Sequence, residues 1–329
     1  MSATLTKTQR RQLVFITLGA VALFVLVRRL PTGTNMPHYD YVPAGQSSVQ
    51  FCDPGNPQFL PATQVQSPVT MTLATAGPVL AGQPVQAVLT LKTYSGKPLG
   101  PDDLATAHAK KLHLLIIDPT LTDYQHVHPV PAGAPGEWAF TFTPRAGGSY
   151  RFFADFVPIV TGNGLYAWAD MPVGGASADK KVERDVSVRS ERVGDPAFAR
   201  GYGGQAAALP PPWVSEKDGY RFTLTPSAQP IRASKLVDLK FAVERIGGGP
   251  VPLQVIMNAF AHLVAFDDQR SGFAHMHPQE YDITKLPDPI HPTLTFKLQL
   301  PRAGRYVIWS QVQIAGREIF APFWFDVTE

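Results

Sequence analysis

Cysteine is nearly absent from this sequence: Cys52 is the only one in 329 residues. A single cysteine excludes an intrachain disulfide, so cysteine content does not reveal the compartment in which the protein works. Cys52 also has no second cysteine or adjacent histidine for haem attachment, and it lacks the small-residue context of a lipoprotein cysteine. We interpret it as a thiol without a functional role.

The sequence also lacks a large excess of acidic or basic residues. The net charge is only +3 and the basic residues are scattered along the chain, which argues against a nucleic-acid partner. Catalytic signatures are missing too: the sequence contains no Gly-x-Ser-x-Gly, no His-Glu-x-x-His, no phosphate-binding loop and no dinucleotide fingerprint. A three-histidine metal with an open position would be able to activate water, but few acidic residues lie near the histidines. We therefore predict a protein that is not an enzyme.

Long apolar runs are limited to one, from Leu13 to Val27, with basic residues on both sides. Fifteen residues are fewer than the roughly 20 that span a bilayer, but flanking arginines can extend their side chains to the interface. No small-x-small cleavage site follows the run, so we favour an uncleaved signal anchor in residues 1–30 over a cleaved signal peptide. The slight charge bias predicts a single pass through a bacterial inner (cytoplasmic) membrane, with the bulk of the chain in the periplasm.

Proline (32 residues) and glycine (27 residues) are abundant, and short alternating apolar runs recur at about 10-residue spacing. This pattern favours an all-β protein built from immunoglobulin-like β-sandwiches. We predict an extended Pro/Gly-rich tether (31–66), β-sandwich domain 1 (67–173), a charged Gly/Pro-rich linker (174–217) and β-sandwich domain 2 (218–329). The expected strands are 69–76, 84–94, 112–117, 138–142, 150–157 and 165–171 in domain 1, and 220–225, 236–245, 262–266, 293–300, 306–314 and 318–327 in domain 2.

An internal repeat supports two copies of one domain. The segment HLLIIDPTLTDYQHVHP, from His113 to Pro129, recurs without a gap 149 positions later as HLVAFDDQRSGFAHMHP, from His262 to Pro278. Similar closing phrases, PRAGGSY and PRAGRY, follow the two copies. A period of this size is far beyond the solenoid range of about 20–50 residues. Six of the nine histidines lie in the repeat, so any chemistry in it is expected twice.

The spacing of these histidines suggests a metal site. Residues i and i+2 of an extended segment face the same way, and a hairpin would return the first histidine of each copy to the other two. Three imidazoles suit copper or zinc, and the missing cysteine excludes a blue-copper centre. Met276 would add a soft ligand in the second copy only. The candidate ligands are His113, His126, His128, His262, His275 and His277, with Asp118 and Asp267 as candidates for orienting them from the second shell.

A structural interpretation of the same residues stays open. His-x-His-Pro is also compatible with a corner whose imidazoles hydrogen-bond to backbone carbonyls or to Asp118 and Asp267. Duplication of the domain would by itself explain why the motif occurs twice. The spacing alone does not decide between a metal site and a corner.

The stretch HLLIIDPTLTDYQHVHP…GEWAFTFTPRAGGSYRFFADFVP resembles a group of bacterial secreted or membrane-anchored β-sandwich proteins with a His-x-His-Pro core, some of them associated with heavy-metal or copper handling. The resemblance covers residues 112–158 well and 261–313 less closely. It implies immunoglobulin-like or cupredoxin-like domains, with His113, His126 and His128 as candidate ligands. It implies a fold more than an activity.

Two functional hypotheses follow. In the first, the protein is a non-catalytic, membrane-anchored extrinsic subunit that stabilises a membrane-protein complex from the periplasmic side. A respiratory or photosynthetic assembly is the natural host by analogy. In the second, it is a periplasmic protein that binds or delivers copper or another heavy metal through its duplicated histidines. The first is preferred at this point because it requires no ion, and because the aromatic-rich segment EIFAPFWFDV near the C-terminus would suit a contact surface.

Overall fold

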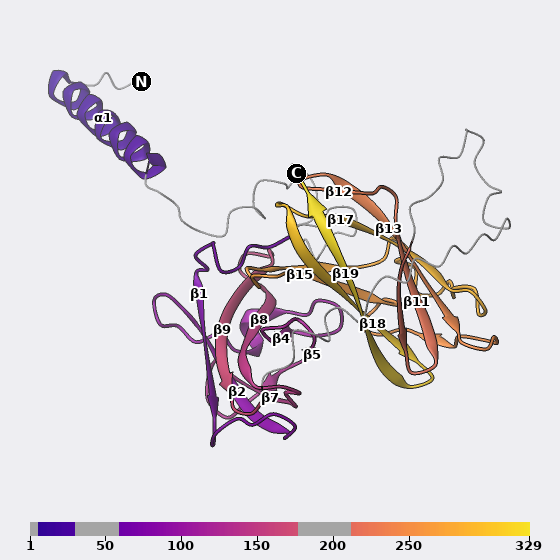
Figure 1. The fold of residues 1–329 in the computed structure, drawn as a ribbon. Helices are drawn as coiled ribbons and strands as arrows, with labels where there is room; N and C mark the ends of the chain where they lie inside the picture. Colours follow the sequence, from indigo (N-terminus) through magenta and orange to yellow (C-terminus); the bar gives the residue numbers. More distant parts are fainter. Residues whose placement is uncertain (1–5, 30–58, 177–211) are drawn as a thin grey trace, which may run out of the picture.

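The computed structural model describes residues 6–29, 59–176 and 212–329 (Figure 1). Helix α1 (Lys7–Arg29) contains the apolar run, and its window Lys7–Leu26 is long and apolar enough to cross a membrane. No part of that window is buried against the rest of the described chain. By length and composition, the protein therefore has an N-terminal helix suited to a single membrane pass.

Domain 1 is a sandwich of two sheets, apart from a short 3₁₀ helix at Pro101–Asp103. One sheet has the strand order β1-β2-β7-β6, and the other has the order β3-β8-β4-β5 with β9 paired to β8. Their strands are β1 (Val69–Thr75), β2 (Val85–Thr93), β3 (Leu104–Ala105), β4 (Leu112–Ile117), β5 (Tyr124–Val127), β6 (Val130–Pro131), β7 (Glu137–Phe142), β8 (Gly148–Pro158) and β9 (Leu165–Val173).

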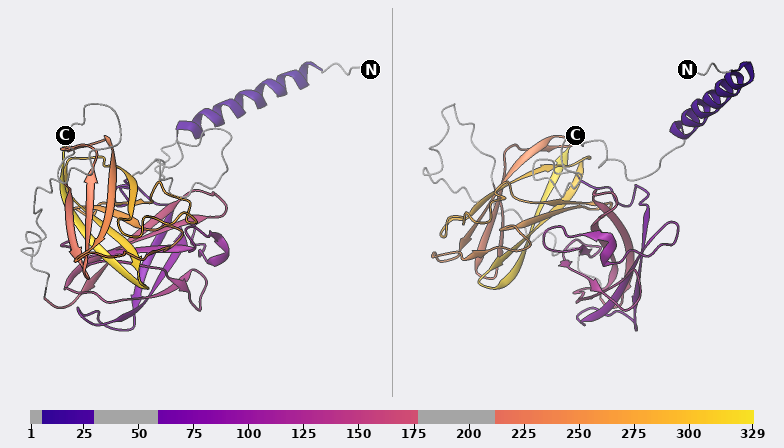
Figure 2. Two further views of the ribbon diagram at one scale, coloured as in Figure 1. Left: turned by 90° about the vertical axis from the view of Figure 1, so that its right-hand side faces the viewer. Right: turned by 180° about the vertical axis from the view of Figure 1, so that it is seen from behind.

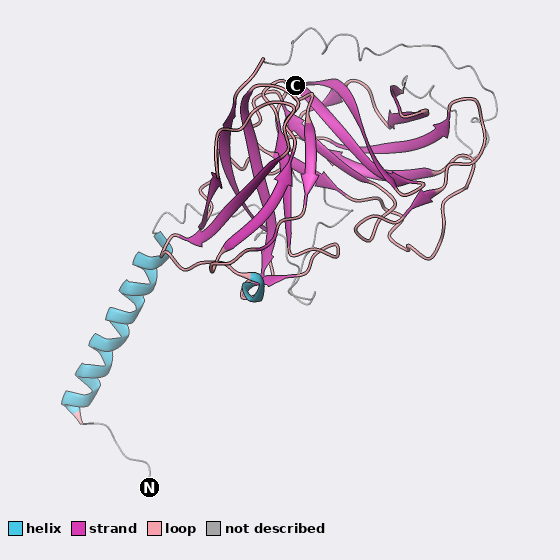
Figure 3. Cartoon of the chain, turned by 90° about the horizontal axis from the view of Figure 1, so that it is seen from below, coloured by secondary structure: helices cyan, strands magenta, loops and turns pink. Residues whose placement is uncertain are grey.

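Domain 2 repeats this arrangement, with one sheet in the order β10-β11-β13-β17 and the other in the order β12-β19-β18-β15-β16, where β14 also pairs β18. Its strands are β10 (Trp213–Lys217), β11 (Tyr220–Pro226), β12 (Ile231–Arg232), β13 (Leu236–Arg245), β14 (Leu253–Gln254), β15 (His262–Asp267), β16 (Phe273–Met276), β17 (Thr293–Gln299), β18 (Gly304–Ile314) and β19 (Arg317–Thr328). The predicted fold class, two tandem β-sandwiches behind an N-terminal apolar helix, is confirmed (Figure 3).

Burial patterns distinguish the outer sheets from the inner ones. Strand β13 alternates between exposed and buried residues, as expected for a sheet with one solvated face. Strands β4 and β15 are instead buried at all six positions. Both faces of these two strands are therefore covered by protein.

A third hydrophobic core between the domains explains this burial. On β4, Leu114 and Ile116 pack in the core of domain 1, whereas Leu115 and Ile117 pack with Val264, Phe266 and Trp309 of domain 2. The sheets that contain β4 and β15 thus face each other, and the two sandwiches lie side by side (Figure 2). A histidine in step with Leu115 must also face this interface, because strand side chains alternate.

The end of the predicted tether belongs to this interface. Leu60 N donates to Phe273 O (2.7 Å) and Phe273 N donates to Leu60 O (3.1 Å), and both side chains are in the interdomain core. Gly272 is required beside this contact, since a Cβ there would collide with the Leu60 carbonyl. The prediction of an unpacked segment is therefore wrong for residues 59–63. Residues 30–58, including Cys52, lie outside the described part of the chain.

The structure corrects two further predictions, the start of domain 2 and the role of the aromatic last strand. Domain 2 begins with β10, which pairs β11 from Trp213 onward, five residues before the predicted start at 218. Residues 177–211 of the linker lie outside the described ranges. The aromatic last strand, β19, places Phe323 and Phe325 in the core of domain 2 and Trp324 in the interdomain core. The contact surface expected on this strand is thus used at least in part within the chain itself.

Candidate metal centre

Two β-hairpins gather the predicted histidines. In domain 1, β4 pairs β5 with Leu115 opposite His126, and extending this register by two residues places His113 opposite His128. In domain 2, Val264 pairs His275, and His262 stands at the same relative position to His277. The alternation of each strand turns all six imidazoles toward the interdomain face.

Each hairpin forms a compact group of three imidazoles. One nitrogen from each ring lies within 4.8 Å of the other two in both groups. We call them the domain-1 centre (His113, His126 and His128) and the domain-2 centre (His262, His275 and His277). The hairpin predicted from the spacing is therefore present twice.

The two centres adjoin each other across the interface. The ring centroid of His275 is 5.9 Å from that of His113 and 5.5 Å from that of His126. A further histidine, His108, stacks on His277 with 3.9 Å between ring centroids. His108 was not predicted, because the matching turn of the second copy carries Met257 at its place and the repeat therefore gives no signal.

Backbone carbonyls set the tautomer of the first histidine in each centre. His113 Nε2 lies 3.1 Å from Ala107 O, and His262 Nε2 lies 3.0 Å from Ile256 O. A carbonyl only accepts, so both Nε2 atoms must carry the proton. In the neutral ring, Nδ1 then presents its lone pair to the centre.

The middle histidines are oriented from the opposite domain. His126 Nδ1 donates to Gln311 Oε1 (2.8 Å), and the amide of Gln311 is held in this orientation because its Nε2 donates to Glu318 (3.0 Å). His275 Nδ1 donates to the carboxylate of Asp155 (3.4 Å). Each middle ring therefore turns an unprotonated Nε2 inward.

The inward nitrogens are short of hydrogen-bond partners. His113 Nδ1 and His126 Nε2 lie 3.1 Å apart, yet in neutral rings neither has a proton to donate to the other. Two nitrogens bound to one tetrahedral ion at 2.0–2.1 Å would be about 3.3 Å apart. Within the described ranges, four of the six candidate ligands have a buried nitrogen without a hydrogen-bond partner: His128, His262, His275 and His277.

Burial keeps these rings neutral. It is the largest cause of the lowered pKa in all six, and it takes the pKa of His128 and of His275 to about 3. The pKa values of the others are also lowered, with neighbouring histidines adding to the effect in each case: His113, His126, His262 and His277. Neutral imidazole is the form that binds metal ions, so no proton has to leave at neutral pH.

The two predicted aspartates have a different role. Asp118 accepts backbone hydrogen bonds from Thr120, Thr122 and Asp123, and Asp267 accepts from Ser271 N and Oγ. Both residues therefore organise the turn at the far end of the hairpin, away from the histidines at its start, and the prediction that they orient those histidines is wrong. The side chains that orient the middle histidines are those of Asp155 and Gln311, which lie in strands without any motif that marks them.

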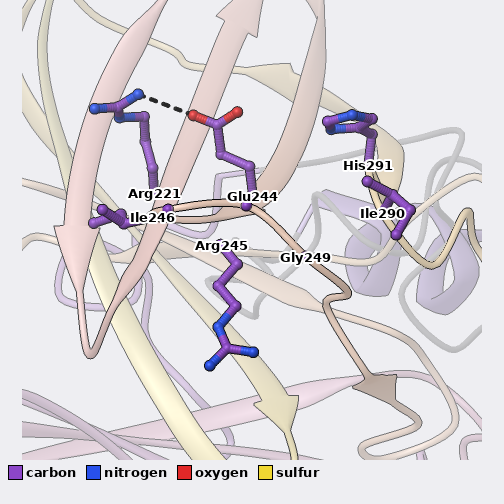
Figure 4. A pocket seen from close by; sticks show the side chains of 9 residues that line it. Arg221, Glu244, Arg245, Ile246, Gly249, Ile290 and His291 are labelled. Atoms are coloured by element: carbon purple, nitrogen blue, oxygen red, sulfur yellow. Dashed lines mark hydrogen bonds and ion pairs between the residues drawn. The ribbon is translucent and has the colours of Figure 1, made fainter.

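Met276 does not face the domain-2 centre, so the prediction that it adds a soft ligand there is wrong. It is buried in the core of domain 2, because it lies between His275 and His277 on an extended segment and faces the opposite way. A separate pocket in domain 2, lined by Arg221, Glu244, Arg245, Gly247–Gly249 and His291 among others, contains none of the six candidate ligands (Figure 4). The histidine chemistry of the described chain is thus concentrated at the interface.

Comparison with known proteins identifies a family but no activity. A family model described as "Domain of unknown function (DUF8832)" matches residues 63–169 and 215–329, which correspond to the two sandwiches. A comparison with curated protein sequences gave no match.

Several solved structures are similar at low TM-scores. Red sea bream transglutaminase has a TM-score of 0.24 at 7% identity, covering 80% of this chain and 31% of that chain. A CARDB domain from Pyrococcus furiosus, solved in complex with di-metal ions, has a TM-score of 0.19 at 19% identity, covering 41% and 99%. Fibronectin(III)-like modules of Clostridium thermocellum CbhA have a TM-score of 0.18 at 10% identity, covering 78% and 93%.

Proposed function

We propose that this chain, which belongs to the family described as "Domain of unknown function (DUF8832)", is a membrane-anchored metal-binding protein that holds copper or zinc at its two histidine centres. One observation carries the proposal. Five buried imidazoles and the partly buried imidazole of His128 converge in two groups, and hydrogen bonds on the outer side of four of the six turn an unprotonated nitrogen inward. A purely structural corner would leave several of these buried nitrogens unsatisfied, at a cost in stability.

The donor set limits the choice of ion. Both centres offer imidazole nitrogen and no thiolate, a combination that suits copper and zinc and does not suit magnesium or calcium. The three ligands of each centre are neutral, so the ion keeps its full charge within a buried site. Because the centres lie at the interface, a bound ion would be enclosed for as long as the two domains stay packed together. Such enclosure suits storage of a metal more than rapid catalysis.

Helix α1 supports attachment to a membrane, and we place the two sandwiches in the periplasm of a bacterium. This location rests on the slight charge bias of the N-terminal segment, which favours an N-terminus on the cytoplasmic side. Binding or delivery of copper or another heavy metal outside the cytoplasm is the role that we propose there.

A structural subunit of a membrane complex is the second candidate. Exposed apolar side chains favour it, because Val160, Tyr281 and Leu286 are 78–90% exposed on loops of the two domains. The two roles are compatible, since a subunit of a complex can also bind metal. Co-purification of membrane proteins in mild detergent would support this second role.

The first test is metal analysis of the full-length protein, purified in mild detergent after growth with copper or zinc. We expect up to one ion per centre, lost in a variant with His126, His128, His275 and His277 all changed to Ala. His291→Ala is the matched control, because His291 lies outside both centres. Circular dichroism would check that the fourfold variant keeps its β structure. A wild-type protein that takes up neither ion, even from excess, would overturn the proposal.

A further inference from the structure

Asp155 and Gln311 occupy the same place in the two repeats. Asp155 stands opposite His113 in the pairing of β4 with β8, and Gln311 stands opposite His262 in the pairing of β15 with β18. Both side chains point to the interface and reach the middle histidine of the other domain. The middle histidine of each centre is thus oriented by the domain to which it does not belong.

Although the position is the same, the chemistry of the two residues differs. Asp155 presents a carboxylate to His275, and its side chain is 16% exposed. Gln311 presents a neutral amide to His126 and is itself 1% exposed. A carboxylate on the outer nitrogen makes an imidazole a stronger donor and places negative charge beside the bound cation, whereas an amide only orients the ring.

From this difference we infer that Asp155 and Gln311 are positioning residues that set the order in which the centres fill: the domain-2 centre binds its ion more tightly than the domain-1 centre. This inference rests on the proposed function and adds a ranking of the two sites. The contact to Asp155 is longer than the contact to Gln311, 3.4 Å against 2.8 Å. The charge of Asp155 also reaches His113 of the domain-1 centre, which stands opposite it. The domain-2 centre is favoured because the hydrogen bond from His275 Nδ1 places the carboxylate directly on a ligand of that centre.

The ranking can be measured on proteins that keep one centre each. His128→Ala leaves the domain-2 centre intact, and His277→Ala leaves the domain-1 centre intact. Competition of Zn²⁺ between each full-length variant and a chelating dye gives the two Kd values. We expect the domain-2 centre to bind at least tenfold more tightly, since outer carboxylate partners contribute roughly 10- to 100-fold to metal affinity. Equal affinities, or a tighter domain-1 centre, would overturn the inference.

Moving the carboxylate provides a sharper test. The double change Gln311→Glu/Glu318→Gln exchanges the amide and the carboxylate of a hydrogen-bonded pair. In the His277→Ala background it should tighten the domain-1 centre by roughly tenfold. A gain of affinity cannot come from a damaged fold. Asp155→Asn in the His128→Ala background should weaken the domain-2 centre by a similar factor.

If a single-centre variant fails to fold, a Zn²⁺ titration of the otherwise wild-type protein replaces it. Two separate binding steps are expected there, and Gln311→Glu/Glu318→Gln should bring the weaker step toward the tighter one. Two identical steps, or an unchanged weak step in the exchanged protein, would refute the ranking. Absence of any zinc binding would instead refute the proposed function, so the two failures are distinguishable.

Discussion

The domain-1 and domain-2 centres are built by the same hairpin, with three histidines at the same spacing and a backbone carbonyl behind the first of them. They differ in two neighbours. Asp155 and His108 lie beside the domain-2 centre, whereas Gln311 lies beside the domain-1 centre and Met257 stands at the place that matches His108. Local strand geometry therefore repeats the ligands, and the groups that distinguish the centres come from contacts between the domains.

The largest expected effect comes from the two faces of β8. Phe152 packs in the core of domain 1 and its neighbour Phe153 packs in the interdomain core, both without exposed surface. Changing either to Ala should lower the free energy of unfolding by about 3–5 kcal/mol. Urea denaturation of the detergent-solubilised protein measures this.

The same pair separates the role of the interface from that of the domain core. Phe153→Ala should also weaken metal binding, because Asp155 faces the same way two residues later. Phe152→Ala should leave metal affinity unchanged in the folded protein. Equal metal affinities in the two variants would show that the interface does not support the centres.

Acid should destabilise the metal-free protein. The pKa of His275 is about 3 in the folded state, against about 6.5 in an unfolded chain. Below pH 6.5 the unfolded chain therefore binds the additional proton, and stability falls as the pH falls from 6.5 toward 3. At pH 5 this residue alone accounts for about 2 kcal/mol. Denaturation midpoints that do not change between pH 7 and pH 5 would contradict the burial of neutral rings.

Asp118 should affect stability without affecting metal binding. Asp118→Ala removes the acceptor of three turn amides, which costs about 1–3 kcal/mol. Since the carboxylate does not contact the histidines, the Kd for zinc should remain within error of the wild type. A large loss of affinity in a folded Asp118→Ala protein would show that Asp118 does orient the histidines.

The smallest effect is expected from the stacked ring of His108. His108→Ala should weaken the domain-2 centre by about 0.5–1.5 kcal/mol through loss of packing on His277. Met257→Ala is the matched control and should leave that centre unchanged. Zinc competition in the His128→Ala background would detect the difference. Equal effects of the two changes would show that the ring of His108 does not support the domain-2 centre.

Much of the architecture was predictable from local patterns. Alternating apolar and polar residues, bounded by turn residues, predicted most of the longer strands within two residues of their ends. The repeat predicted two sandwiches and three clustered histidines in each. The strands β5 and β16, which carry the first histidine of each His-x-His pair, were too short to be recognised by alternation alone. The turn roles of Asp118 and Asp267 were missed because an aspartate after a strand is equally compatible with a ligand-orienting role and with a turn.

The two sandwiches, the apolar N-terminal helix and the grouping of histidines within each hairpin were predictable from the sequence alone, because they depend on strand periodicity and on residues close in the chain. The packing of the domains brings the two centres together, lets Asp155 and Gln311 orient histidines across the interface and buries residues 59–63, none of which was predictable from the sequence. Those contacts join residues far apart in sequence through the packing of one β face on another. A strand pattern reports that a face is buried, but it does not report which surface covers it.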